Sequence, residues 1–154
     1  MTERAFELAN AEATAALADL ASTLTVEDLE RDLGGGWTVA MAFAHLAFWD
    51  QRMIVILRRW LAEGFDSSPI DSQVVNDALK VVCHAIEPRT AVELCLSSAE
   101  AVDAEFDTLT PELVKQLEEH AAATETQFRM NRSLHRNAHL DDIQALLAPL
   151  KNAL

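Results

Sequence analysis

Residues that break helices are scarce in this chain and are concentrated at few places. Its 154 residues include four glycines and four prolines, and three of the glycines are adjacent at residues 34–36. Alanine, leucine and glutamate, which favour helices, are abundant between these breaks. No run alternates β-branched or aromatic residues with polar ones as a strand would. The sequence therefore predicts an all-α protein.

Apolar residues recur at helical spacing in four long segments, which predict a four-helix bundle with extra short helices. A partial capping box at Thr25 and Asp28 indicates one short helical turn, and residues 120–127 are either a connection or a helix start. In chain order we expect helices over residues 3–23, from the N-cap Thr38 to near Gly64, from Asp71 or Ser72 to Ile86, from Pro88 through Phe106, from Thr110 and Pro111 through Leu117, and from about Phe128 to Leu147, ending at or before Pro149.

Acidic residues outnumber basic ones by 25 to 12, which gives a formal charge of −13. Such a surface repels phosphate backbones and anionic membranes, so we expect no nucleic-acid partner and no membrane partner. The N-terminus lacks the basic and apolar regions of a signal peptide, and the apolar stretch 39–48 is too short to span a bilayer. We therefore expect one domain, residues 1–154, in the cytoplasm.

Two of the five histidines, His135 and His139, are four residues apart in the last predicted helix. This spacing places both imidazoles on one helix face, where they can share a metal ion. On a helical wheel the apolar arc of Leu140, Ile143, Leu147 and Leu150 lies beside them. We therefore expect the pair at the edge of the core, where bundles build partly buried polar pockets.

A third histidine, His45, interrupts the apolar run from Val39 to Trp49. If it is buried it needs a polar partner: a side chain, a carbonyl or a metal. Three neutral imidazoles on two neighbouring helices would suit zinc, nickel or iron, with coordination positions open for a ligand. Taken singly, the H-x-x-x-H pair is a common pattern, and His45 is explained as well by a hydrogen-bonded core histidine.

The remaining polar candidates have simpler interpretations as surface or core residues. We expect His84 and His120 on the surface and Asp50 in a pair with Arg52. Asp142 is expected to be a solvated acid, with an acceptor for His139 or a fourth ligand as the alternatives. Cys83 and Cys95 have no paired metal spacing and are expected to be small core residues. The three tryptophans are expected in the core or in a pocket wall.

Two segments resemble signatures of the DinB-like superfamily, which includes the N-terminal domains of mycothiol-dependent maleylpyruvate isomerases. The segment from Gly36-Trp37-Thr38-Val39 through Ala44-His45-Leu46-Ala47-Phe48-Trp49-Asp50 is similar to the second-helix signature. The segment His135-Arg136-Asn137-Ala138-His139-Leu140-Asp141-Asp142-Ile143 is similar to the last-helix signature. The intervening helices match in length and order more than in identity.

The resemblance implies a DinB-like four-helix bundle, often dimeric, with a divalent metal held by His45, His135 and His139. Some relatives are thiol transferases or isomerases that use a low-molecular-weight thiol, and a coordinated thiol loses its proton readily. Three interpretations stay open: such a metal-dependent enzyme acting on a small molecule, a non-catalytic small-molecule-binding or protective bundle, and a homodimer whose histidines form a polar core network.

Overall fold

A computed structural model describes residues 4–151, and for residues 150 and 151 it describes the backbone alone. Within this range the chain forms seven helices and one two-stranded hairpin, which confirms the all-α prediction. The predicted helix residue Glu3 and the predicted apolar side chain of Leu150 lie outside the described part. In chain order the elements are α1 (Ala5–Thr23), α2 (Val26–Leu29), β1 (Asp32–Gly34), β2 (Trp37–Thr38), α3 (Val39–Glu63), α4 (Ser72–His84), α5 (Pro88–Asp107), α6 (Pro111–Ala123) and α7 (Ser133–Lys151).

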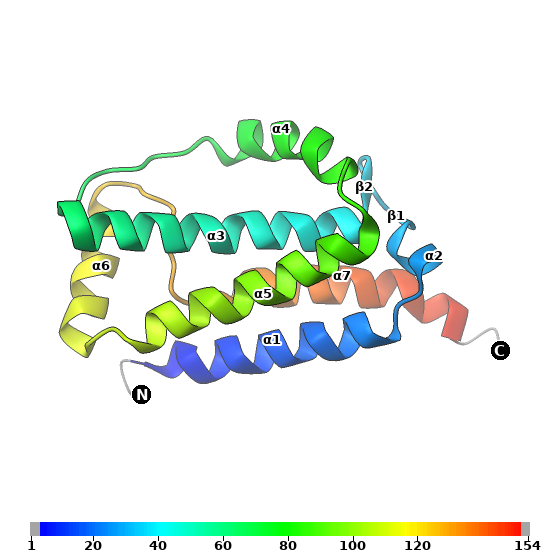
Figure 1. The fold of residues 1–154 in the computed structure, drawn as a ribbon, viewed down its shortest axis with the longest axis horizontal. Coiled ribbons are helices and arrows are strands. Elements are labelled where there is room, and N and C mark those ends of the chain that lie inside the picture. The colour runs from blue at the N-terminus through cyan, green and yellow to red at the C-terminus, as the bar shows by residue number, and fades with distance from the viewer. Residues whose placement is uncertain (1–3, 152–154) are drawn as a thin grey trace.

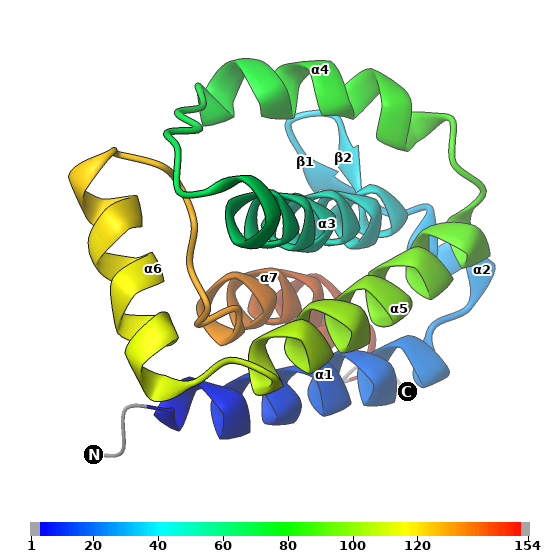
Figure 2. The same ribbon diagram turned by 60° about the vertical axis from the view of Figure 1, so that its left-hand side comes forward.

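The four long helices α1, α3, α5 and α7 pack against one another around a common core (Figure 1). Figure 2, a view closer to the axis of α3, shows α3 and α7 side by side and α4 on the outer side of α3. Helix α6 lies across one end of the bundle, and α2 with the hairpin lies at the other end. Helix α4 is therefore a third element near the region where α3 and α7 lie side by side.

Helix α3 is central because apolar residues surround most of its circumference. The side chain of Thr38 caps its start by accepting from the amide of Met41 at 3.2 Å, as the sequence predicts, and Gly64 ends it with a φ of 97°. By length and composition alone this helix could span a membrane. However, 78% of its apolar 18-residue stretch is buried within the protein. This burial is what a central bundle helix requires.

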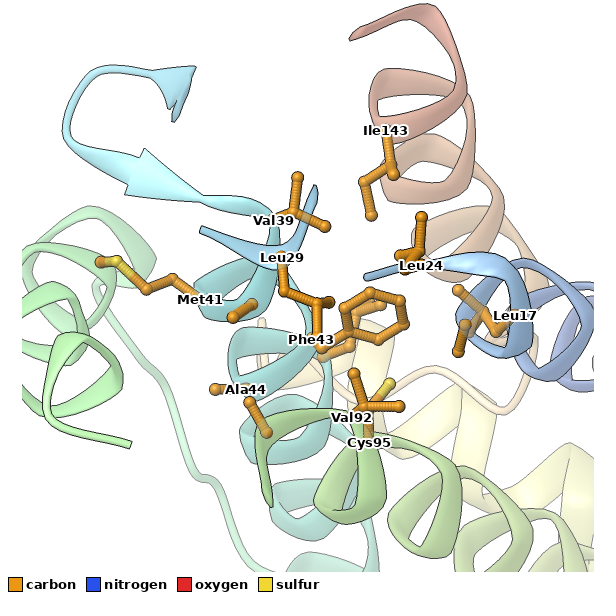
Figure 3. Packing of buried hydrophobic residues seen from close by; sticks show 14 of the residues in the cluster. Leu17, Leu24, Leu29, Val39, Met41, Phe43, Ala44, Val92, Cys95 and Ile143 are labelled. Atoms are coloured by element: carbon orange, nitrogen blue, oxygen red, sulfur yellow. The ribbon is translucent and has the colours of Figure 1, made fainter. Parts of the chain in front are cut away.

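The core at the hairpin end of the bundle is built around Phe43 (Figure 3). Its ring lies between Leu17 of α1, Val92 and Cys95 of α5, and the region of α7 that carries Ile143. A second cluster, at the α6 end, contains Trp60, Phe106 and Phe128. The first cluster thus packs α3 against the second half of α7, and the second cluster packs α3 against α5 and α6.

The hairpin was not predicted, although the three glycines were expected to break the chain. Asp32 pairs with Thr38 and Gly34 with Trp37, and residues 34–36 turn the chain with φ values of 103°, 61° and 81°. Positive φ at three successive residues is accessible to glycine with little strain. The strands are only three and two residues long, too short to show an alternating pattern. The turn delivers Trp37 to the start of α3.

Most of the predicted helix starts are confirmed, but the predicted start of the last helix is not. Asp71 and Thr110 cap α4 and α6, and the Thr25–Asp28 capping box is complete, although aspartate replaces the usual glutamate. The segment 120–127 is divided between the last turn of α6 and the connection to α7. The start predicted near residue 128 is wrong, because the chain from residue 124 to 132 is an irregular connection and α7 begins at Ser133.

The predicted end of α7 at Pro149 is also wrong, because the helix continues to Lys151. A proline within a helix loses one backbone hydrogen bond, and this loss matters least near an end, where few bonds remain to be broken. The start of α7 is fixed by tertiary contacts that a local pattern does not show. The buried side chain of Asn10 on α1 accepts from the amides of Arg132 at 2.7 Å and Ser133 at 3.0 Å.

Candidate metal centre

The structure brings together the three histidines that the sequence singles out. His45 lies in the first half of α3, and His135 and His139 lie one turn apart on α7. One ring nitrogen from each falls within 4.8 Å of the others, so the three form a group that could hold a metal ion. His45 is buried, and the two α7 histidines are half-buried beside the core residues Leu140 and Ile143. The position predicted at the edge of the core is confirmed.

The spacing of the ring nitrogens suits a shared ligand atom. Nε2 of His45 lies 3.0 Å from Nε2 of His135, and the ring centroids of each histidine pair are 4.9–5.0 Å apart. Two imidazole nitrogens bound to one divalent ion at about 2.1 Å lie roughly 3.0–3.4 Å apart. A distance of 3.0 Å is equally that of an N–H···N hydrogen bond. The geometry accommodates either one proton or one metal ion between the two rings.

All three imidazoles are held in the neutral form that metal binding needs. Burial lowers the pKa of His45 to about 4, with further lowering by the charges of His139 and Arg132. Burial and the same two neighbours lower the pKa of His135 to about 2. For His139, burial lowers the pKa and the exposed carboxylate of Asp142 partly opposes this. At neutral pH each imidazole therefore keeps one lone pair, and a metal ion does not have to compete with a second ring proton.

Aromatic rings fix the orientation of His45. The ring of Trp37 stands edge-on to it with centroids 5.5 Å apart, and Trp49, one turn further along α3, stands edge-on at 6.2 Å. These contacts restrict rotation of the imidazole. The prediction that tryptophans lie in the core or in a pocket wall is confirmed, with Trp60 in the core.

The outer nitrogens of the cluster lack the acceptors that usually support metal-bound histidines. Nδ1 of His135 lies 3.3 Å from Nη2 of Arg132, a group that can only donate, and Nδ1 of His45 is buried with no hydrogen-bond partner in the described residues. Without a metal, His135 then carries its proton on Nε2 and donates it to His45. If Nε2 bound a metal, the proton would have to be on Nδ1, where it would face the guanidinium. The donor set thus fits a divalent ion, and the contact with Arg132 would weaken its binding.

A buried ionic network lies directly behind the histidines. The carboxylate of Asp50 is 1% exposed and accepts from Arg132 Nε at 2.7 Å and from Arg136 Nη2 at 3.1 Å. Arg136, fully buried, also pairs with Asp103 of α5 at 2.9 Å. Because a buried charge without a partner is costly, these pairs hold α3, α5 and α7 in register. The network thereby positions His135, which lies between the two arginines in sequence.

The predicted pair between Asp50 and Arg52 is wrong. Arg52 instead donates to the carbonyls of Ser68 and Gln127, and so ties together the two connections that follow α3 and α6. Residues two positions apart on a helix point in different directions, so Asp50 faces the core while Arg52 faces these loops. The sequence analysis predicts no role for Asn10, Asp103, Arg132 or Arg136.

The other polar candidates are placed mainly as predicted. His84 and Asp142 are exposed, and both cysteines are buried. Burial raises the pKa of Cys83, and burial followed by the charge of Asp50 raises that of Cys95 to about 12. His120 differs from its predicted surface position. It is half-buried, its ring stands edge-on to Trp60 at 5.0 Å, and its Nε2 lies 2.9 Å from the carbonyl oxygen of Asp66.

Two cavities open on either side of the histidines and share His45, His135 and Asn76 as wall residues. One, of about 430 Å³, extends from the histidines towards Arg129 and Arg132. The other, of about 610 Å³, extends past His139 towards Trp37 and the hairpin. Both are within the size range of small-molecule sites. Two molecules could therefore approach the cluster from opposite sides.

Comparison with known proteins finds no match to this chain among family models, curated proteins or solved structures.

Proposed function

We propose that His45, His135 and His139 hold one divalent metal ion, zinc, nickel or iron, with coordination positions left open. The observation that carries this proposal is the convergence of three neutral imidazoles, with ligand atoms within 4.8 Å of one another, between two cavities. Three protein ligands with room for another group are typical of catalytic rather than structural metal sites. The resemblance to the DinB-like superfamily, with the same three histidines, supports the proposal.

We propose further that the protein is a transferase or isomerase that uses a low-molecular-weight thiol. A divalent ion, when bound, favours ionisation of a thiol that coordinates it. The chain's own residues would bind and orient the two reactants, with Trp37 and Trp49 restricting rotation of the His45 imidazole. The two cavities meet at the histidines, so a thiol in one and an acceptor in the other would be adjacent.

A second candidate is a non-catalytic protein that binds or sequesters a small molecule. It is favoured by the lowered pKa of each cluster histidine, which leaves none protonated to act as an acid at neutral pH. It is also favoured by the buried state of Cys83 and Cys95, which supply no thiolate. Homodimerisation and a cytoplasmic location remain predictions from the sequence.

Turnover separates the two candidates. Protein reconstituted with zinc, nickel or iron is assayed for thiol consumption with several low-molecular-weight thiols and electrophilic acceptors. If the protein is an enzyme, turnover should require both the metal and His139. The control variant His84→Ala, altered at an exposed histidine, should keep full activity. Ligand binding without turnover by any metal form would favour the non-catalytic protein.

A further inference from the structure

The charged wall residues of the cavity of about 430 Å³ are basic, which is unusual for this acidic protein. Acidic residues are about twice as frequent as basic ones in the chain, yet the described wall residues of this cavity include Arg129 and Arg132 and no aspartate or glutamate. The side walls are apolar, with contributions from Trp49 and Met53. A concave, partly apolar surface with cations at one end attracts an anion in a protein that otherwise repels anions.

The two arginines keep donor groups available for a ligand. Arg132 uses Nε for Asp50 and Nη2 for His135, and within the described residues no partner is present for its Nη1. Arg129 is exposed and has no hydrogen bond or ion pair within residues 4–151. Because a guanidinium binds an oxyanion through two parallel N–H groups, each arginine can still bind a carboxylate or phosphate oxygen.

A third donor comes from α4. The side-chain oxygen of Asn76 accepts from Nε1 of Trp49 at 3.2 Å, which leaves its NH₂ group as a donor at the cavity wall. Asn76 adjoins both cavities and so lies beside the histidines. This neutral donor could bind a further polar group of a ligand in the same cavity.

The second cavity does not share this preference. Its wall contains one cation, Lys80, together with the carboxylates of Asp77 and Asp142, and the ammonium of Lys80 already lies over the ring of Trp37. Acidic groups therefore outnumber basic ones on that side of the histidines, and that cavity does not attract an anion. The anion-attracting end is confined to the cavity of Arg129 and Arg132.

We propose that this cavity binds the oxyanion of a small-molecule ligand, a carboxylate or a phosphate, between Arg129 and Arg132. The rest of that ligand extends along Trp49 and Met53 to the three histidines. This inference rests on the proposed function, because it names the ligand class of the same site. It assigns one reactant as an acidic molecule whose anionic group is bound in the cavity next to the histidines.

The first experiment uses metal-free protein, so its result does not depend on metal binding. Succinate, inorganic phosphate and neutral succinamide are titrated while binding is followed by calorimetry or NMR shifts. We expect one of the two anions to bind and succinamide to bind at least about tenfold more weakly. The stronger anion identifies carboxylate or phosphate as the natural group. Failure of both anions to bind, or equal binding of succinamide, would overturn the inference.

Matched variants locate the site. Arg129→Gln should weaken binding of the favoured anion about tenfold, while Arg59→Gln should leave it unchanged. Arg59 is an exposed arginine at a separate cavity of about 350 Å³, so the two variants lose the same charge. Equal loss in both variants would show a general charge effect and contradict the inference.

A second experiment uses zinc-loaded protein and compares 3-mercaptopropionate with 2-mercaptoethanol. The carboxylate-bearing thiol should bind more tightly, or mercaptoethyl phosphate should if phosphate is the favoured anion, and Arg129→Gln should remove that preference. If zinc never binds, the proposed function fails, while the metal-free titration still decides the oxyanion site. If zinc binds and neither charged thiol is preferred, the oxyanion site fails and the metal proposal stands.

Discussion

The carboxylate of Asp50 on α3 accepts a hydrogen bond at 2.7 Å from Nε of Arg132, the residue immediately before α7. Both side chains are buried, and the same guanidinium contacts the ring of His135. This pair connects the helix that carries His45 to the helix that carries the other two histidines. The position of the candidate metal ligands therefore depends on a buried ionic contact as well as on apolar packing.

Asp50→Asn should destabilise the protein by about 3–5 kcal/mol, because it leaves the buried charge of Arg132 without a carboxylate partner and leaves Arg136 with Asp103 alone. Denaturant unfolding followed by circular dichroism measures this. The control is Glu105→Gln, which breaks the more exposed pair with Arg58 and should cost less than about 1 kcal/mol. Similar costs for the two variants would show that the buried network contributes no more than a surface pair.

Asn10→Ala should loosen the start of α7, because it removes the acceptor for the amides of Arg132 and Ser133. A loss of about 1–3 kcal/mol is expected, with faster hydrogen exchange at these two amides. Thr110→Ala removes the N-cap of α6 and is the matched control. It should lower stability by about 1 kcal/mol without changing exchange at α7. Unchanged exchange in the Asn10 variant would refute the capping role.

The stability of metal-free protein should fall as the pH drops below about 6.5. The folded state depresses the pKa of His45 to about 4 and of His135 to about 2, whereas in the unfolded chain both titrate near 6.5. Below that value the unfolded state binds more protons, so the stabilisation present above pH 6.5 is lost progressively on acidification.

The size of this effect follows from the slope of the free energy of unfolding against pH. Between pH 6.5 and 5, each of these histidines should contribute a slope that approaches about 1.4 kcal/mol per pH unit to the free energy of unfolding. Urea unfolding at several pH values in the presence of a chelator measures it. His135→Gln should reduce the slope by about one histidine's share. A slope that is the same in the variant would contradict burial of a neutral His135.

Arg132→Gln should strengthen metal binding, because the bond from Arg136 to Asp50 still joins α7 to α3 in the variant. The guanidinium faces Nδ1 of His135 at 3.3 Å, where a metal-bound imidazole carries a proton, and glutamine offers an oxygen that accepts this proton. We expect an affinity gain of about tenfold, measured by competition with a chelating dye, since outer contacts of this kind change metal affinity about 10–100-fold. Weaker binding in the variant would mean that Arg132 orients His135 productively as it is.

The sequence predicts the helices well, because their signals are local. Thr38, Asp71 and Thr110 cap helices through bonds to amides two or three residues later, and such bonds can be recognised in a short window. The start of α7 could not be predicted in this way, since its capping side chain, Asn10, is 122 residues away from Arg132. The hairpin was not predicted because its strands are too short to show an alternating pattern of apolar and polar residues.

The candidate site shows the same division between local and distant signals. His135 and His139 are visible as a pair because helical spacing determines their common face, and His45 is visible because it interrupts an apolar run. Their convergence required the packing of α3 on α7, which no local pattern encodes. The resemblance to a known family suggested it, and the three-histidine grouping itself is confirmed.

The buried ionic network left a sequence signal that was overlooked. Asp50 shares its helix face with three apolar residues, Leu46, Met53 and Leu57, which all become buried. Arg136 likewise shares a face with Leu140 and Ile143. One acid and one base on apolar faces of two helices predict a buried pair. The assignment of Asp50 to Arg52 failed because it used proximity in sequence in place of helical direction.

The metal content of untagged protein tests the central claim most directly. After reconstitution with zinc, nickel or iron and removal of free ions, elemental analysis should find about one divalent ion per chain. His139→Ala should lose this ion and keep its helical circular dichroism spectrum, while His84→Ala, altered at an exposed histidine outside the cluster, should retain it. A metal content near zero with every metal, or an unchanged content in His139→Ala, would contradict the proposed site.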